Sequence, residues 1–172
     1  HRQALEAFIE TLDHGLMGLL DPRFYLLSLD PGMGKTMACA CFLKAWKEEN
    51  FSPPSSIIIG VSRLEEIQTY ITAADLSPTE FGVFTSAVDM NDLGVSFEEQ
   101  SQTKILFTTQ QMIRSRTNGK SVADAVDFHY QGQPRALRLW DENILPADPQ
   151  VIRMDNLMGL AGPLRPKFPD FI

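Results

Sequence analysis

The fold of this chain is decided by the stretch Asp30-Pro31-Gly32-Met33-Gly34-Lys35-Thr36. A strand-like apolar run, residues 24–29, comes before it, and a helix-like run, residues 37–46, follows it. The order of strand, glycine loop, Gly-Lys-Thr and helix is the context in which this motif binds phosphate. Backbone N–H groups of the loop and of the first helical turn can point at an anion, and the helix dipole favours negative charge there. The sequence therefore predicts a phosphate-binding loop.

Each part of the loop has an expected role. Lys35 is expected to reach the terminal phosphates as a point charge, and the Thr36 hydroxyl to bind a magnesium ion. The backbone around the phosphates would belong to Pro31, Gly32, Met33 and Gly34. The usual pattern has glycine six residues before the lysine, where this chain has Leu29. The alternative interpretation is a chance glycine turn that leads into a helix.

A second acidic motif follows an apolar strand-like run at residues 136–140. Asp141 and Glu142 come directly after this run, and ligands bind at the carboxyl ends of strands in a parallel sheet. We expect Asp141 to hold the metal, directly or through water, and Glu142 to orient and deprotonate the attacking water. An acidic start of a helix at Asp141 is the alternative, since acids also favour helix N-termini.

The rest of the chain alternates between strand-like and helix-like runs. This order predicts an α/β fold with three layers and a mostly parallel central sheet. One helix is expected to end at Gly15, and another to begin near Ser62 as its N-cap. Further strands are expected at residues 57–61, 81–84 and 105–108, and further helices at 4–12, 64–71 and 110–116.

Composition excludes several classes of protein. The chain has 172 residues, 44% of them apolar, and a net charge of −7, which argues against broad, non-specific attraction to nucleic acid. No apolar stretch approaches the roughly 20 residues of a membrane span, and no secretion signal is evident. Cys39 and Cys41 lack a second cysteine pair to complete a zinc site. We therefore expect a cytoplasmic protein from a reducing compartment.

The order of these motifs resembles the first RecA-like domain of superfamily 2 helicases, the DEAD/DEAH-like group. The resemblance implies a P-loop NTPase domain in which the loop at residues 30–36 binds ATP and Mg²⁺. It also implies that Asp141 and Glu142 form the Asp-Glu box that holds magnesium and activates water. Leu29 and the pair Asn143-Ile144 depart from the usual residues of the family.

Weaker matches to the same family suggest further contacts. Residues 59–68 and 107–113 are similar to segments that touch the backbone of single-stranded nucleic acid, with DNA favoured over RNA. The residues implied are Ser62, Arg63, Thr108 and Thr109. Ordinary helix capping is the alternative for the three hydroxyl residues. Gln3 matches a glutamine that reads adenine, because an amide both donates and accepts; it could equally be a surface residue of the helix.

The resemblance covers residues 1–145. Residues 146–172 are proline-rich and are expected to lead toward a second RecA-like domain that carries an arginine finger. Because such a finger contributes about 10³–10⁵ in rate, we expect slow ATP hydrolysis by this chain alone. A motor of the viral DNA-packaging type and a nucleotide-binding switch without useful hydrolysis are the alternatives. The guanine-reading Asn-Lys-x-Asp string is absent, which argues against GTP.

Overall fold

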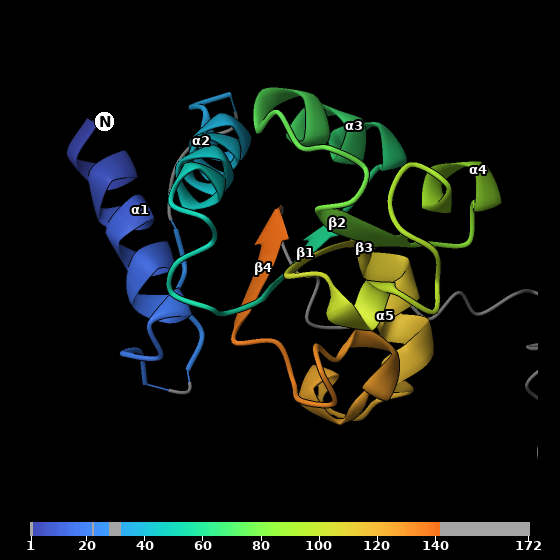
Figure 1. Ribbon diagram of the computed structural model, residues 1–172. Coiled ribbons are helices and arrows are strands. Elements are labelled where there is room, and N and C mark those ends of the chain that lie inside the picture. Colours follow the sequence, from blue (N-terminus) through green and yellow to red (C-terminus); the bar gives the residue numbers. More distant parts are fainter. Residues whose placement is uncertain (1, 22, 28–31, 142–172) are drawn as a thin grey trace, which may run out of the picture.

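Four parallel strands form the central sheet in the part of the protein that the structure describes. The computed structural model describes residues 2–21, 23–27 and 32–141 (Figure 1). The strands run in the order β2-β3-β1-β4, and all neighbouring pairs are parallel. Their bounds are β1 Ile57–Val61, β2 Phe81–Phe84, β3 Ile105–Thr109 and β4 Leu137–Asp141. The predicted α/β class with a parallel sheet is therefore confirmed.

Helices cover both faces of the sheet, an arrangement compatible with a three-layer α/β fold (Figure 1). Because side chains alternate along a strand, Ile57, Ile59 and Val61 enter the core under α1, α2 and α3, whereas Ile58 packs under α5. The helix bounds are α1 Arg2–Leu16, α2 Lys35–Glu48, α3 Leu64–Ala73, α4 Val88–Asn91 and α5 Gln110–Thr117. Three 3₁₀ turns are η1 Gln100–Gln102, η2 Val122–Asp124 and η3 Val126–Phe128.

The register of the strands brings three chain segments to one edge of the sheet. Val61 at the end of β1 lies opposite Thr109 of β3 and Asp141 of β4. Each of these residues is the last of its strand. The residues that follow β1 and β3 therefore start from the same carboxyl edge as Asp141, which is the edge where parallel sheets bind ligands.

Residues 24–27 do not form the predicted strand. Phe24 is 81% exposed and Leu26 is 92% exposed, and β4 pairs only with β1 in the described sheet. Residues 28 and 29, the rest of the expected strand, lie outside the described residues. An apolar run indicates a preference for burial, but a strand also needs a neighbour with which to pair, and residues 24–27 pair with no described strand.

The first helix also differs from expectation at its end. Gly15 does not stop α1, which continues to Leu16. Gly15 is buried, and a Cβ atom at this position would lie 2.7 Å from Leu137 Cδ1. The absence of a side chain at Gly15 therefore permits close packing of α1 on β4. The chain leaves the helix at Gly18, where φ is +70°, a left-handed conformation that favours glycine.

A buried arginine fixes the beginning of β4. Arg135 is 2% exposed, and its guanidinium donates to the carbonyls of Gln100, Thr103, Lys104 and Phe128 at 2.8–3.1 Å. Burial lowers its pKa to about 9, so the group is still charged at neutral pH. These bonds join η1, the entrance of β3 and η3 to the segment before β4.

The described residues include no helix with the length and apolar composition needed to cross a lipid bilayer.

Candidate functional site

The N-terminus of α2 begins at two glycines in left-handed conformations. Gly34 is its N-cap with φ of 84°, and Gly32 has φ of 78°; both are left-handed conformations that glycine adopts without strain. The N–H of Ala38 donates to Gly34 at 2.8 Å, which closes the first helical turn. Gly34 has no side chain with which to cap this N-terminus, and the first turn contains no acidic residue. The geometry is that of a glycine turn at a helix N-terminus, where backbone N–H groups can point at an anion.

The predicted metal ligands lie in contact although 105 residues separate them in the chain. Thr36 Oγ1 donates to Asp141 Oδ2 at 2.9 Å. Thr36 belongs to the first turn of α2, and Asp141 ends β4. The N-terminus of α2 and the acidic end of β4 therefore meet at the carboxyl edge of the sheet.

This pair fits a magnesium ion. Mg²⁺ prefers oxygen ligands, keeps several waters and takes one or two carboxylates together with phosphates. Thr36 supplies a hydroxyl and Asp141 a carboxylate, both half-buried. Within the described residues, no group of three or more His, Cys, Asp or Glu side chains could bind a metal. The small set of oxygen donors matches an ion that is held largely by phosphates and water.

Two buried groups lie behind the carboxylate. The hydroxyl of Tyr70, from α3, donates to Asp141 Oδ2 at 2.7 Å, and Cys39 of α2 is 1% exposed. Burial, followed by the charge of Asp141, raises the pKa of the Cys39 thiol. Burial, followed by charges on Cys39 and Asp141, raises the pKa of Tyr70. Tyr70 is therefore a protonated donor at neutral pH.

Sequence reasoning did not identify Tyr70. Its position three residues after Ile67, on the buried face of α3, is the only indication that the sequence offers. A tyrosine among core positions needs an acceptor for its hydroxyl, but the sequence does not name that acceptor.

The region after β1 is only partly as predicted. The N-cap of α3 is Arg63 rather than Ser62, because Glu66 Oε2 accepts from the N–H groups of Ser62 and Arg63 at 3.0 and 3.1 Å. The Ser62 hydroxyl instead accepts from Gln110 Nε2 at 3.1 Å. Ser62 and Arg63 are both exposed and accessible at the carboxyl edge.

The two threonines at the end of β3 have different environments. Thr108 is fully buried, and its hydroxyl donates to the carbonyl of Phe84 at 2.6 Å. This corrects the predicted nucleic-acid contact at Thr108, whose hydroxyl is not accessible to a phosphate. Thr109 is half-buried and caps α5, accepting from the N–H of Met112 at 3.1 Å. Capping uses its oxygen as an acceptor and leaves its O–H as a donor.

Three predicted site residues are not seen in contact with Thr36 and Asp141. Gln3 is exposed in the first turn of α1. The beginning of α1 lies toward the end of the molecule to which β4 points (Figure 1), but Gln3 makes no hydrogen bond to the described site residues. Pro31 and Glu142 lie outside the described residues.

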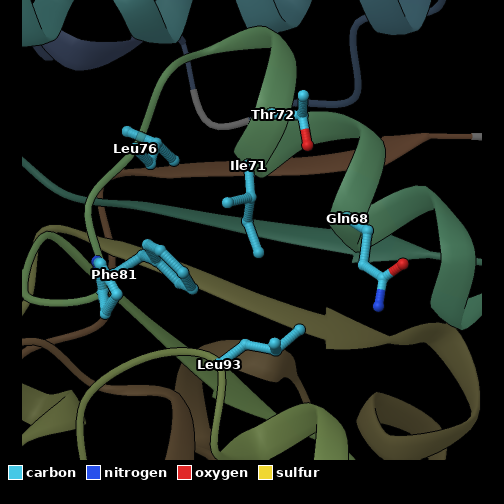
Figure 2. A pocket seen from close by; sticks show the side chains of 7 residues that line it. Gln68, Ile71, Thr72, Leu76, Phe81 and Leu93 are labelled. Carbon is cyan, nitrogen blue, oxygen red and sulfur yellow. The ribbon is translucent and has the colours of Figure 1, made fainter.

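A separate apolar cavity lies between α3, β2 and the segment after α4. It has a volume of about 320 Å³, and Figure 2 shows Ile71 of α3 and Leu93 converging on it near Phe81. Gln68 and Thr72 are the polar residues in its lining, which contains no charged side chain. This cavity lacks the cationic and carboxylate groups that a magnesium–triphosphate complex requires, and it contains none of the predicted site residues.

Comparison with known proteins does not identify the chain. No family model, curated protein or solved structure matches it. Function must therefore be inferred from the residues and their geometry.

Proposed function

We propose that this chain binds Mg²⁺-ATP and is the RecA-like, P-loop ATP-binding domain of a nucleic-acid-dependent ATPase. The observation that carries the proposal is the contact between Thr36 and Asp141, 2.9 Å apart at the carboxyl edge of the sheet. A glycine loop alone, or an acid after a strand alone, is common. Their meeting at a helix N-terminus is the arrangement that a triphosphate–metal complex needs.

Each residue has a role in this proposal. N–H groups at the start of α2 donate to the phosphate oxygens, and Lys35 adds positive charge at the terminal phosphates. Thr36 and Asp141 would hold Mg²⁺, and the bound ion would neutralise negative charge on the phosphates. Glu142, the next residue in sequence, is the proposed base for the attacking water. Gln3 is the proposed adenine contact.

The same edge of the sheet offers contacts to a second ligand. Arg63 and the hydroxyls of Ser62 and Thr109 lie at junctions between strands and helices, where side chains bind phosphate oxygens without reading sequence. We therefore propose single-stranded nucleic acid, DNA rather than RNA, as the partner, and a helicase or translocase of superfamily 2 as the parent. A second RecA-like domain would complete its catalytic site.

Titration calorimetry with ATP tests nucleotide binding directly. Binding should be tighter with magnesium than with EDTA, and ATP should bind better than GTP. Lys35→Ala should weaken Mg²⁺-ATP binding by about 3 kcal/mol, since hydrogen bonds to charged groups contribute about 1.5–3 kcal/mol. This loss corresponds to roughly 100-fold in affinity.

The matched control is Lys44→Ala. Lys44 is an exposed lysine on the same helix, and its loss should leave the affinity unchanged. An equal loss of Mg²⁺-ATP affinity in both variants would indicate general charge attraction and would contradict phosphate binding by the loop at residues 30–36. ATPase activity of the parent protein that is the same with and without single-stranded DNA would favour a nucleotide-binding switch instead.

A further inference from the structure

The carboxylate of Asp141 is held from inside the core as well as from α2. Tyr70 Oη lies 2.7 Å from Asp141 Oδ2, and Thr36 Oγ1 lies 2.9 Å from the same oxygen. Tyr70 is fully buried, whereas Asp141 and Thr36 are half-buried. The phenol therefore approaches the carboxylate from the protein side of the site.

The choice of acceptor is informative. A buried tyrosine hydroxyl needs a partner, and most side-chain hydrogen bonds in proteins go to backbone or water. Here the acceptor is the carboxylate proposed to hold the metal. Both hydroxyls donate to Oδ2. This oxygen of the carboxylate is thus fixed from two helices, α2 and α3.

The ring of Tyr70 is itself immobilised. Its centroid lies 5.7 Å from that of Phe107 in β3, at an interplanar angle of 39°. Ile67, one turn earlier in α3, is fully buried in the same core. The hydroxyl is therefore presented from a rigid element, as is required of a group that orients a metal ligand.

From this geometry we propose that Tyr70 is a positioning residue that orients Asp141 for magnesium binding in the nucleotide site. The inference rests on the proposed function. Partners that orient metal ligands typically change metal affinity or activity by about 10–100-fold when they are mutated. Tyr70 does not touch the nucleotide in this proposal; it acts only through the carboxylate.

Tyr70→Phe tests the proposal, because it removes one oxygen and keeps the ring against Phe107. The magnesium-dependent gain in ATP affinity, measured by calorimetry with magnesium and with EDTA, should fall by about 10–100-fold. The affinity in EDTA should not change, a split that general destabilisation would not produce. Tyr130→Phe is the matched control, since the Tyr130 hydroxyl contacts Gln131, and it should bind like the wild type.

A double-mutant cycle checks that Tyr70 acts through Asp141. Once Asp141→Ala has removed the carboxylate, Tyr70→Phe should cause no further loss of magnesium dependence. A full additional loss in that background would overturn the inference.

A measurement on the unmodified chain covers the case in which Tyr70→Phe does not fold. The chain contains three tyrosines, so ¹³Cζ labelling gives three resonances that can be assigned. The Tyr70 resonance should shift when Mg²⁺-ATP is added and much less when ATP is added with EDTA, with Tyr25 and Tyr130 as references. An unchanged Tyr70 resonance would overturn the inference.

The two proposals fail in different ways. Wild-type protein whose ATP binding is independent of magnesium would overturn the proposed function and this inference with it. Magnesium-dependent binding that is identical in wild type and Tyr70→Phe would overturn only the role of Tyr70.

Discussion

The N-termini of α2 and α3 lie at the same edge of the sheet but satisfy their backbone groups differently. In α3, Glu66 at the third helical position accepts from the N–H groups of Ser62 and Arg63. In α2, the N-cap is Gly34, the third position is Met37, and the first turn contains no acid. A helix that supplies its own carboxylate needs no external anion, whereas the first turn of α2 contains no carboxylate. The difference separates a structural N-terminus from a candidate phosphate site.

The contrast can be reversed by giving α2 the carboxylate of α3. Met37 is 53% exposed, so Met37→Glu has room at the third position. The new carboxylate should compete with phosphate for the N–H groups and repel it, weakening Mg²⁺-ATP binding by about 3 kcal/mol, or roughly 100-fold. The same change should stabilise the ligand-free fold by about 0.5–1 kcal/mol.

Calorimetry and urea unfolding measure these two effects, with neutral Met37→Gln as the control. Wild-type ATP affinity in Met37→Glu would show that phosphate does not bind at this N-terminus.

Removing the carboxylate of α3 should have a smaller effect, and on stability alone. Glu66→Ala leaves the N–H groups of Ser62 and Arg63 without their acceptor and should cost about 1 kcal/mol of unfolding free energy. For a chain of this size the melting temperature should fall by about 2–4 °C. Exposed Glu65 gives the control, since Glu65→Ala removes no such acceptor. A loss of ATP affinity in Glu66→Ala would contradict the view that the N-terminus of α3 is structural and that of α2 binds phosphate.

The smallest effect is expected at Arg63. As the N-cap of α3, Arg63 donates its backbone N–H to Glu66, and this bond does not involve its side chain. Arg63→Ala should therefore change the unfolding free energy by less than about 0.5 kcal/mol. Binding of fluorescent single-stranded DNA should weaken, and the slope of log affinity against log salt should fall by about 1. Lys120→Ala removes an exposed charge beyond the end of α5 and should leave the slope unchanged. An equal change in the two variants would leave no specific role for Arg63.

Much of the fold follows from local pattern. The Ile-rich run at residues 57–61 predicts β1 with its exact bounds, because a strand covered on both faces is apolar throughout. The expected helix at 37–46 lies within α2. The meeting of Thr36 with Asp141 was expected from the pairing of the two motifs, although residues 24–27 do not form the strand expected before the loop.

Other features depend on geometry finer than sequence periodicity. Thr108 and Thr109 are adjacent and chemically identical, yet one is fully buried and the other caps α5. Successive side chains of a strand point to opposite faces, and Thr109 is also the last residue of β3. The bond from Tyr70 to Asp141 depends on the rotation of α3 about its axis. The apolar residues 24–27 remain outside the described sheet because composition alone does not provide a pairing partner.

The anchor at Arg135 gives β4 a fixed origin. Asp141 lies six residues further on, roughly 20 Å of extended chain, and β4 pairs with a described neighbour along β1 only. The position of Asp141 at the end of β4 thus depends on the buried Arg135 guanidinium at the start of that strand. Loss of the carbonyl acceptors around Arg135 should displace the Asp141 carboxylate without changing any atom near the proposed nucleotide site.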